Sequence, residues 1–195
     1  VANKLMKGFI GSANVDTNSR LCMASTVAGH KRAFGADVVP GCYEDLDEAD
    51  LIVLVGSNAA WCHPILFQRI MRNKETRGAK LVVIDTRRTP TAESADLFLQ
   101  IAPGADQALF CGLLVYLAKV AAFDDEYIRR HTAGLQQALE GAQNIAASIE
   151  ATALATGLRE VDIASFFELF AQTPRAVTAF SQGVNQSAQG TDKVN

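Results

Sequence analysis

Four short apolar runs recur along the chain, and each has the character of a strand that is buried on both faces. The runs are LIVLVGS (51–57), KLVVIDT (80–86), LFLQI (97–101) and AVTAFS (176–181). Apolar runs of this length, closed by a small or polar residue, are typical of parallel strands that helices cover on both sides. The pattern therefore predicts a mostly parallel sheet.

Helical periodicity occupies the first and last intervals between these runs, and a loop is expected between the second and third runs. From Pro64 to Gly78 the apolar residues recur on one face, with Pro64 in the first helical turn and Gly78 just past the end. Alternating strands and helices build βαβ units, so we predict an α/β fold: a doubly wound, mostly parallel (Rossmann-like) sheet with helices on both faces. Further helices are expected over 43–49, 106–121, 124–131, 135–149 and 161–172.

Composition and charge exclude some classes of function. The 195 residues carry a formal net charge of −3, which gives no electrostatic case for binding nucleic acid or an anionic membrane, because either would need a basic patch. The longest apolar runs are far too short to span a bilayer, and VANKLMKGFIG lacks the apolar region of a signal peptide. We expect a cytoplasmic protein with no nucleic-acid or membrane partner. Because the chain starts without Met and stops at GTDKVN, it is interpreted as a fragment of a longer polypeptide.

The cysteines Cys22, Cys42, Cys62 and Cys111 form no CxxC pair and match no zinc template, so we expect reduced thiols. Cys22 lies in NSRLCMASTVAGH (18–30), between a polar turn and a run of small residues. A free cysteine usually behaves as a small buried hydrophobe. A single thiolate on a metal that a cofactor carries would leave no spacing signature, so both interpretations of Cys22 stay open at this point.

Polar residues follow the first two runs, at the strand ends where ligands bind in open α/β sheets. The first run leads into GSN (56–58), which suits the approach of a phosphate to the next helix or forms an ordinary turn. The second ends in Asp85, followed by Thr86 and two arginines. An acidic residue at that place binds a ribose hydroxyl or a base edge in dinucleotide-binding folds, and otherwise it caps a turn.

The last two runs also lead into polar loops. PGAD (103–106) places a tight turn at Gly104 and then Asp106, which either caps the next helix or contacts a ligand. The last run is followed by QGVNQS (182–187), whose amide side chains both donate and accept hydrogen bonds, as a pterin or purine edge requires. Four such loops at one sheet edge indicate a large polar cofactor.

Five segments, taken in order, resemble the molybdopterin oxidoreductase family, and the resemblance covers essentially the whole chain. Within the family it is greatest to the large subunit of prokaryotic assimilatory nitrate reductase. It implies a bis(molybdopterin guanine dinucleotide) molybdenum cofactor and an iron–sulfur cluster in a domain outside this chain. It also implies that nitrate is reduced to nitrite by oxygen-atom transfer, with electrons from a donor protein or reductase subunit. The segments are NSRLCMASTVAGHKRAFG, GCYEDLDEADLIVLVGSNAAWCHPILFQRI, VIDTRRTPTAESAD, PGADQAL and FSQGVNQSAQGTDKVN.

The resemblance also assigns roles to individual residues. Cys22 corresponds to the catalytic cysteine whose thiolate binds molybdenum, in a segment over 1–35, while 36–195 form one compact domain for the molybdopterin guanine dinucleotide. The implied cofactor-binding residues are Asn18 near the metal; Gly56, Ser57 and Asn58 at the pyrophosphate; Asp85, Thr86, Arg88, Gly104 and Asp106 at the guanosine end; and Gln182, Gly183, Asn185 and Gln186 at the pterin.

Two other functions stay open as alternatives. A formate dehydrogenase of the same family would use the same scaffold for a two-electron oxidation. The pair Cys22–Met23 favours nitrate reductase, because formate dehydrogenases often have selenocysteine and histidine at these positions. A non-catalytic nucleotide-binding α/β module would keep the sheet without the metal. We expect the fragment alone to be inactive.

Overall fold

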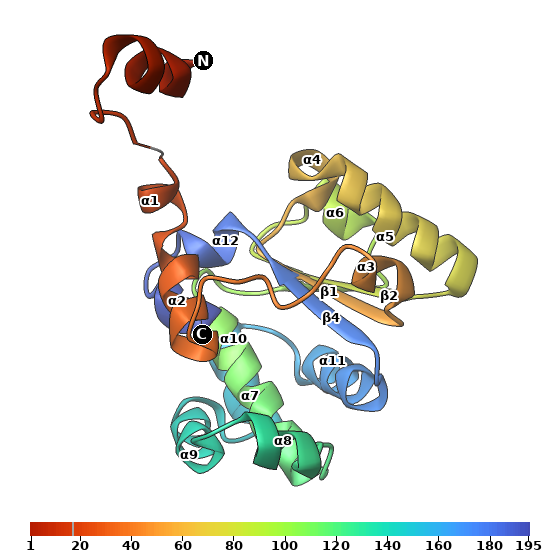
Figure 1. Cartoon of the computed structure of the whole chain (residues 1–195). Coiled ribbons are helices and arrows are strands. Elements are labelled where there is room, and N and C mark those ends of the chain that lie inside the picture. The colour runs from red at the N-terminus through yellow and green to blue at the C-terminus, as the bar shows by residue number, and fades with distance from the viewer. Residues whose placement is uncertain (17) are drawn as a thin grey trace.

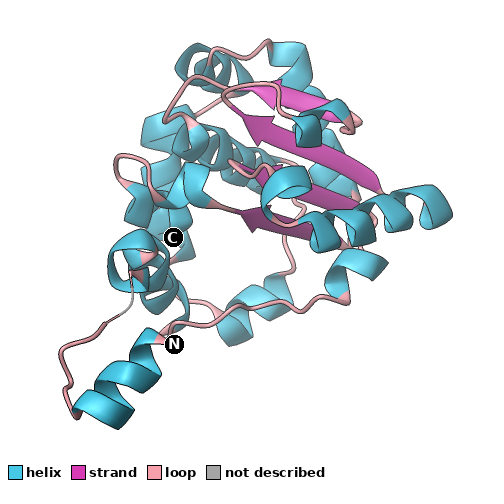
Figure 2. Ribbon diagram, turned by 90° about the horizontal axis from the view of Figure 1, so that it is seen from above, coloured by secondary structure: helices cyan, strands magenta, loops and turns pink. Residues whose placement is uncertain are grey.

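The computed structural model describes residues 1–16 and 18–195, and a four-stranded sheet lies at its centre (Figure 1). The strands lie in the order β3-β2-β1-β4 and all of them pair in parallel (Figure 2). They coincide with the four apolar runs, which confirms the predicted parallel sheet. Their bounds are β1 (Leu51–Val55), β2 (Lys80–Asp85), β3 (Leu97–Gln100) and β4 (Ala176–Phe180).

Helices make up most of the remaining structure. The first of them, η1, is a π-helix that buries none of its residues and extends away from the sheet (Figure 1). In chain order the helices are η1 (Lys4–Ile10), α1 (Ser19–Cys22), α2 (Ala24–Phe34), α3 (Asp45–Glu48), α4 (Ala59–Cys62), α5 (Pro64–Arg77), α6 (Pro90–Glu93), α7 (Asp106–Lys119), α8 (Asp125–His131), α9 (Leu135–Ala146), α10 (Ile149–Thr156), α11 (Glu160–Gln172), α12 (Gln182–Asn185) and α13 (Gly190–Val194).

The strand order creates a switch point between β1 and β4. β1 is central, and its last residue, Val55, lies opposite Ile84 of β2 on one side and Phe180 of β4 on the other. From β1 the chain first moves outward to β2 and β3, and it then returns to the other side of β1 as β4. In open parallel sheets, ligands bind at the carboxyl ends of the strands where this direction reverses.

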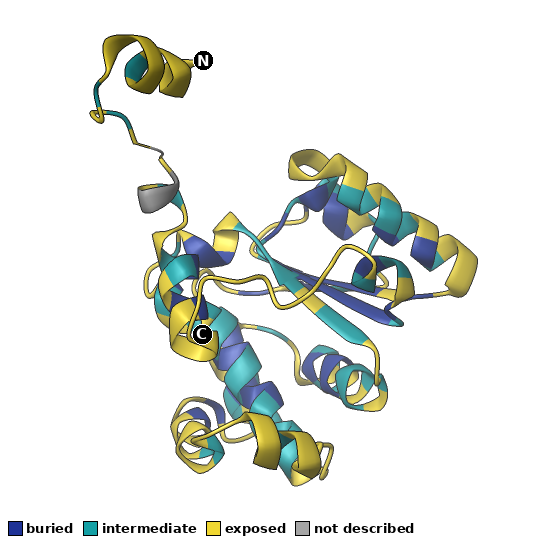
Figure 3. Cartoon of the chain, viewed as in Figure 1, coloured by how far each residue is buried: buried dark blue, intermediate teal, exposed yellow. Residues whose placement is uncertain are grey.

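Helices cover both faces of the sheet, because successive side chains of a strand point to opposite faces. One face buries Leu51, Val53 and Val55 of β1 against residues of α7 and α11. The other face buries Ile52 and Leu54 against residues of α3, α5 and α6. β1 and the middle of β2 are accordingly the most continuously buried strands, whereas the edge strands β3 and β4 are only partly buried (Figure 3). The predicted doubly wound α/β fold is therefore confirmed.

Most predicted helices form, and one of them is divided. α5 begins at Pro64 and ends before Gly78, which adopts a left-handed φ of +77° as the predicted stop signal requires. The helix expected over 135–149 forms as α9 and ends at Ala146, and α10 follows from Ile149 to Thr156 as a separate helix. The division occurs because the hydroxyl of Ser148 accepts a hydrogen bond from the N–H of Ala151 at 3.1 Å, which starts a new helix.

The helix that follows Cys22 packs closely against the C-terminal end of the chain. A Cβ on Gly29 of α2 would lie 2.6 Å from Cγ1 of Val194, and one on Gly190 would lie 3.0 Å from Oγ of Ser25. Small residues at these positions let α2 and α13 approach one another (Figure 1). The segment 1–35 is thus attached to the sheet domain through α2. Within residues 1–16 and 18–195, no helix is long and apolar enough to cross a membrane.

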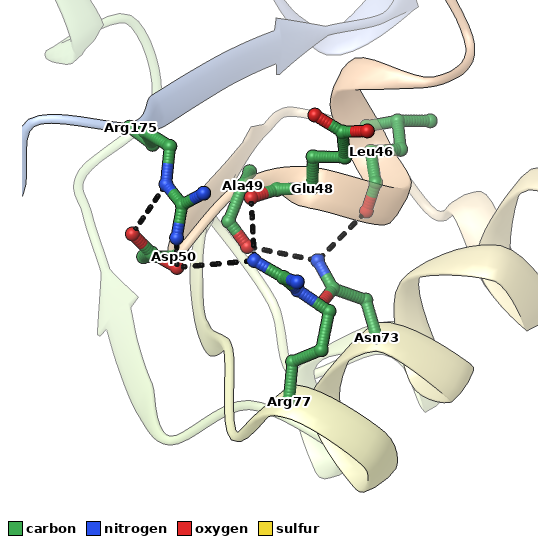
Figure 4. Close-up of polar contacts among 7 residues, drawn as sticks. All are labelled: Leu46, Glu48, Ala49, Asp50, Asn73, Arg77 and Arg175. Atoms are coloured by element: carbon green, nitrogen blue, oxygen red, sulfur yellow. Dashed lines mark hydrogen bonds and ion pairs between the residues drawn. The ribbon is translucent and has the colours of Figure 1, made fainter.

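A buried asparagine joins α3 to α5 at the amino edge of the sheet, opposite the strand ends that carry the polar loops (Figure 4). Asn73 is 2% exposed, and its Nδ2 donates to the carbonyls of Leu46 at 2.9 Å and Ala49 at 2.8 Å. Beside it, the Arg175 guanidinium donates two hydrogen bonds to Asp50, which lowers the pKa of that carboxyl group. These contacts fix the starts of β1 and β4.

Asp96 anchors the start of β3. Its burial raises the pKa of the carboxyl group, but hydrogen bonds from Lys74 and from the N–H of Leu81 outweigh this, and the pKa is lowered. A carboxylate whose pKa is lower in the folded chain stabilises the fold above its unfolded pKa, which is about 4. That stabilisation is lost as the pH falls through the folded-state pKa.

We therefore expect Asp96→Asn to lower the free energy of unfolding by about 1 kcal/mol at pH 7, since the amide cannot form the ion pair with Lys74. The difference from wild type should shrink as the pH falls below about 4, because the wild-type carboxylate then becomes protonated. Urea unfolding at a series of pH values measures this. A difference that stays constant down to low pH would contradict the assignment.

Candidate functional site

The sulfur of Cys22 faces two carboxamides from the loop that follows β4. Cys22 ends α1, and its N–H donates to the carbonyl of Asn18 at 2.8 Å, so Asn18 lies one helical turn before it. The half-buried Sγ lies 3.5 Å from Nε2 of Gln182 and 3.6 Å from Nε2 of Gln186. Residues about 160 positions apart in the sequence therefore meet at one site, which is composed of a thiol and two amide donors.

Asn185 joins this loop to the cysteine segment. It is 4% exposed, and its Nδ2 donates to the carbonyl of Cys22 at 2.5 Å and to Oε1 of Gln182 at 2.8 Å. Its Oδ1 accepts hydrogen bonds from the N–H of Thr26 at 2.8 Å and from the Thr26 hydroxyl at 2.5 Å. These four bonds use the full hydrogen-bonding capacity of a carboxamide. Asn185 is thus saturated by protein partners.

Two glycines let the loops after β1 and β4 touch at the switch point. The N–H of Gly183 donates to the carbonyl of Gly56 at 3.0 Å. A Cβ on Gly183 would lie 2.6 Å from Cα of Gly56, and a Cβ on Gly56 would lie 2.9 Å from Cα of Gly183. Gly56 also has a φ of +53°, a conformation that other residues rarely adopt. The sequence suggested backbone approach at Gly56, and the structure brings a second backbone to it.

The remaining residues of the loop after β1 are Ser57, which is buried, and Asn58, which is partly buried. Ser57 is 5% exposed. The Oδ1 of Asn58 accepts a hydrogen bond from the hydroxyl of Thr91 at 2.9 Å, and that hydroxyl accepts one from the N–H of Ala60 at 3.0 Å. Thr91 belongs to α6 and is fully buried. These contacts connect the loop after β1 to the one after β2.

The loop after β2 presents exposed polar groups at the same edge. The Oδ1 of Asp85 accepts a hydrogen bond from the N–H of Thr86 at 2.7 Å, so this carboxylate also stabilises its own turn. Nε2 of Gln100, at the end of β3, donates to the carbonyl of Thr86 at 3.2 Å. The exposed guanidinium of Arg88 lies 4.9 Å from the centre of the Phe98 ring, a cation–π contact that orients it.

Lys193 of α13, which the sequence pattern does not indicate as a site residue, reaches the loop after β3. Asp106 starts α7 without capping it, and its carboxylate lies 3.5 Å from Nζ of Lys193. The Lys193 side chain is 2% exposed, and its Nζ also donates to the hydroxyl of Ser187 at 3.0 Å. A Cβ on Gly104 would lie 3.6 Å from this Nζ. No periodicity in the polar sequence around Lys193 predicts its burial.

The carboxyl edge therefore combines three features that suit a large polar ligand. It offers a thiol with two amide donors, a backbone contact between two glycines at the switch point, and exposed donors and acceptors after β2. Because the two glycines carry no side chain, a ligand at this contact would meet backbone groups. Among residues 1–16 and 18–195, no group of three or more His, Cys, Asp or Glu side chains is placed to hold a metal ion.

Comparison with known families decides which proteins share this arrangement. The family model described as Molybdopterin oxidoreductase matches residues 1–195, the whole chain. The chain belongs to the molybdopterin oxidoreductase family. The predicted membership is confirmed. The parallel sheet, with polar loops at its carboxyl edge, is therefore the form that a molybdopterin oxidoreductase domain takes in this protein.

Two curated relatives are similar in sequence to this chain over its full length. A protein named nitrate reductase from Shewanella frigidimarina is 52% identical over 195 residues, which are 100% of this chain and 21% of that protein. A protein named F420-dependent formate dehydrogenase subunit alpha from Methanocaldococcus jannaschii is 32% identical over 194 residues, which are 100% of this chain and 28% of that protein. The chain thus spans well under a third of the length of these curated relatives.

A solved structure supports the fold. Acetylene hydratase from Pelobacter acetylenicus superposes with a TM-score of 0.78 over 95% of this chain and 25% of that chain, at 24% sequence identity. At this identity the likeness concerns the fold alone. It agrees with the four-stranded parallel sheet and its surrounding helices.

Proposed function

We propose that this chain is the cofactor-binding part of a molybdenum nitrate reductase, which reduces nitrate to nitrite at a bis(molybdopterin guanine dinucleotide) centre. The observation that carries the proposal is the meeting of Cys22 with the amide loop at the switch point. Family membership and the 52% identity to a nitrate reductase add to it. The alternatives are a formate dehydrogenase of the same family and a non-catalytic nucleotide-binding module.

Cys22 is the residue that would bind the metal. Thiolate sulfur is a soft ligand that suits a redox-active transition metal, and the two carboxamides that face it would donate hydrogen bonds to a bound thiolate. When bound, the cofactor supplies the two-electron redox chemistry that removes an oxygen atom from nitrate. The protein supplies position and electrostatics. We also assign Asn18, one turn before Cys22, to this site.

The loops at the sheet edge would hold the organic part of the cofactor. We assign the backbones of Gly56 and Gly183 to the pyrophosphate, because residues without a side chain let a phosphate approach the main chain. The carboxamides of Gln182 and Gln186 supply the paired donors and acceptors that a pterin edge requires. At the guanosine end we assign residues of the loops after β2 and β3, which are Asp85, Thr86, Arg88, Gly104 and Asp106.

Nitrate is preferred to formate as substrate for two reasons. The nitrate reductase relative is more similar to this chain than the formate dehydrogenase relative, at 52% against 32% identity. Met23 also follows the cysteine, where formate dehydrogenases often carry histidine. We propose an assimilatory role in the cytoplasm, with electrons delivered by a donor protein or reductase subunit through an iron–sulfur cluster outside this chain. We propose no nucleic-acid or membrane partner.

The proposal is tested on the full-length protein. Metal analysis should find molybdenum, acid hydrolysis of the protein should release guanine nucleotide, and reduced viologen as electron donor should support formation of nitrite from nitrate. Formate oxidation without nitrite formation would assign the protein to the formate dehydrogenases. A protein prepared in molybdenum-sufficient cells that contains no molybdenum would instead be a nucleotide-binding module.

A further inference from the structure

The helix that carries Cys22 is broken immediately after the cysteine. α1 ends at Cys22, and α2 begins at Ala24 (Figure 1). In a continuous helix the N–H of Thr26 would donate to the carbonyl of Cys22, four residues earlier. The regular pattern resumes one residue later, where the N–H of Val27 donates to the carbonyl of Met23 at 3.0 Å. One expected backbone hydrogen bond is therefore replaced at this position.

The side chain of Asn185 takes the place of that hydrogen bond. Its Nδ2 donates to the carbonyl of Cys22 at 2.5 Å, and its Oδ1 accepts from the N–H of Thr26 at 2.8 Å. The carboxamide thus stands between the two backbone groups that would otherwise pair. Insertion of a side chain into the helical ladder is a recognised cause of a sharp kink. The hydroxyl of Thr26 adds a further bond to Oδ1 at 2.5 Å and holds the amide in this orientation.

The same carboxamide also orients Gln182. Nδ2 of Asn185 donates to Oε1 of Gln182 at 2.8 Å. Because that oxygen is engaged, Nε2 of Gln182 is the atom that faces the sulfur of Cys22, at 3.5 Å. Asn185 is 4% exposed, and all of its amide capacity is used by these partners.

We infer that Asn185 is a positioning residue, which breaks the helix after Cys22 and thereby presents the cysteine sulfur to Gln182 and Gln186. This inference rests on the proposed function, in which Cys22 binds molybdenum. Without Asn185, the N–H of Thr26 and the carbonyl of Cys22 are free to pair directly. α1 and α2 would then join into one helix, and the sulfur would leave its two amide partners.

The experiment measures how fast the Cys22 thiol reacts in the cofactor-free full-length protein. Iodoacetamide labelling is followed by peptide mass spectrometry, and the rate at Cys22 is divided by the rate at Cys42, an exposed thiol outside the site. In Asn185→Ala we expect this ratio to rise by about fivefold, because the lost hydrogen bonds release the segment that holds the sulfur. Thr26→Val removes one of the four bonds, so it should raise the ratio by about twofold.

A matched control separates positioning from general loosening. Asn73 is also a buried asparagine, and its amide donates to two backbone carbonyls. It lies at the opposite edge of the sheet from Asn185 (Figure 4). Asn73→Ala should leave the labelling ratio at the wild-type value. An equal rise in Asn73→Ala and Asn185→Ala, or an unchanged ratio in Asn185→Ala with native circular dichroism, would overturn the inference. If Asn185→Ala does not fold, an unchanged ratio in Thr26→Val would overturn it.

The measurement needs neither molybdenum nor nitrate. A negative result therefore counts against the positioning role of Asn185 alone, whereas the proposed function stands or falls on metal content and nitrite formation in the full-length protein.

Discussion

Replacing Cys22 with alanine or serine in the full-length protein is expected to lower the rate of nitrate reduction by more than about 100-fold. The loss of residues that only orient metal ligands already costs about 10- to 100-fold, and here the ligand itself is removed. Serine keeps the size of the side chain but replaces a soft sulfur with a hard oxygen, so it should not restore the activity. Nitrite formation with reduced viologen as donor is the measurement.

Cys42→Ser provides the control for this experiment. Cys42 is an exposed thiol near the amino edge of the sheet, and a change there should leave the rate at the wild-type level. Molybdenum content is measured in parallel, because a variant that retains the metal but loses activity shows that the sulfur acts on the chemistry and not only on cofactor loading. Full activity in Cys22→Ala would refute the assignment of the ligand.

The second large effect is expected at the junction of the two glycines. In Gly183→Ala the new methyl group would lie 2.6 Å from Cα and 2.7 Å from the carbonyl oxygen of Gly56. These atoms belong to the backbone, which cannot rotate away as a side chain would, so the loops after β1 and β4 must separate. We expect the free energy of unfolding to fall by about 2–3 kcal/mol, measured by urea unfolding followed by circular dichroism.

Gly141→Ala is the matched control for the glycine junction. Gly141 also lies in a helix, α9, but a Cβ there would meet nothing within 4 Å. Because alanine favours the helix, this change should raise the free energy of unfolding by up to about 1 kcal/mol. Equal unfolding midpoints for Gly183→Ala and wild type would mean that the loops are not in contact in solution. The full-length Gly183→Ala protein should also contain less molybdenum than wild type.

The pattern of residues was sufficient to predict the strands and the principal helices. β1 and β2 are runs such as LIVLV, whose burial on both faces is a local consequence of having no polar position to expose. α5 follows from the spacing of its apolar residues and from Pro64 and Gly78 at its ends. The division between α9 and α10 was missed, because the Ala-rich sequence keeps a helical pattern through Ser148, whose capping hydrogen bond creates the break.

The candidate site was predictable in its parts but not in its contacts. Each strand-end loop is visible in the sequence because glycine, amide and acidic residues follow an apolar run. The contact of Asn185 with Thr26 joins residues 159 positions apart, and that of Lys193 with Asp106 joins α13 to α7. Such pairings leave no periodic trace, since they depend on how distant elements pack.

The sequence by itself determined the strands, most of the helices, and a cysteine that resembles a molybdenum ligand, because these depend on local periodicity and on ordered motifs. Only the tertiary structure decided the strand order β3-β2-β1-β4, which places the switch point between β1 and β4. It also decided that Gly56 meets Gly183 there and that Asn185 interrupts the helix after Cys22. The physical reason is that parallel strands bring their carboxyl ends to one edge, so loops that are distant in the sequence become neighbours in space.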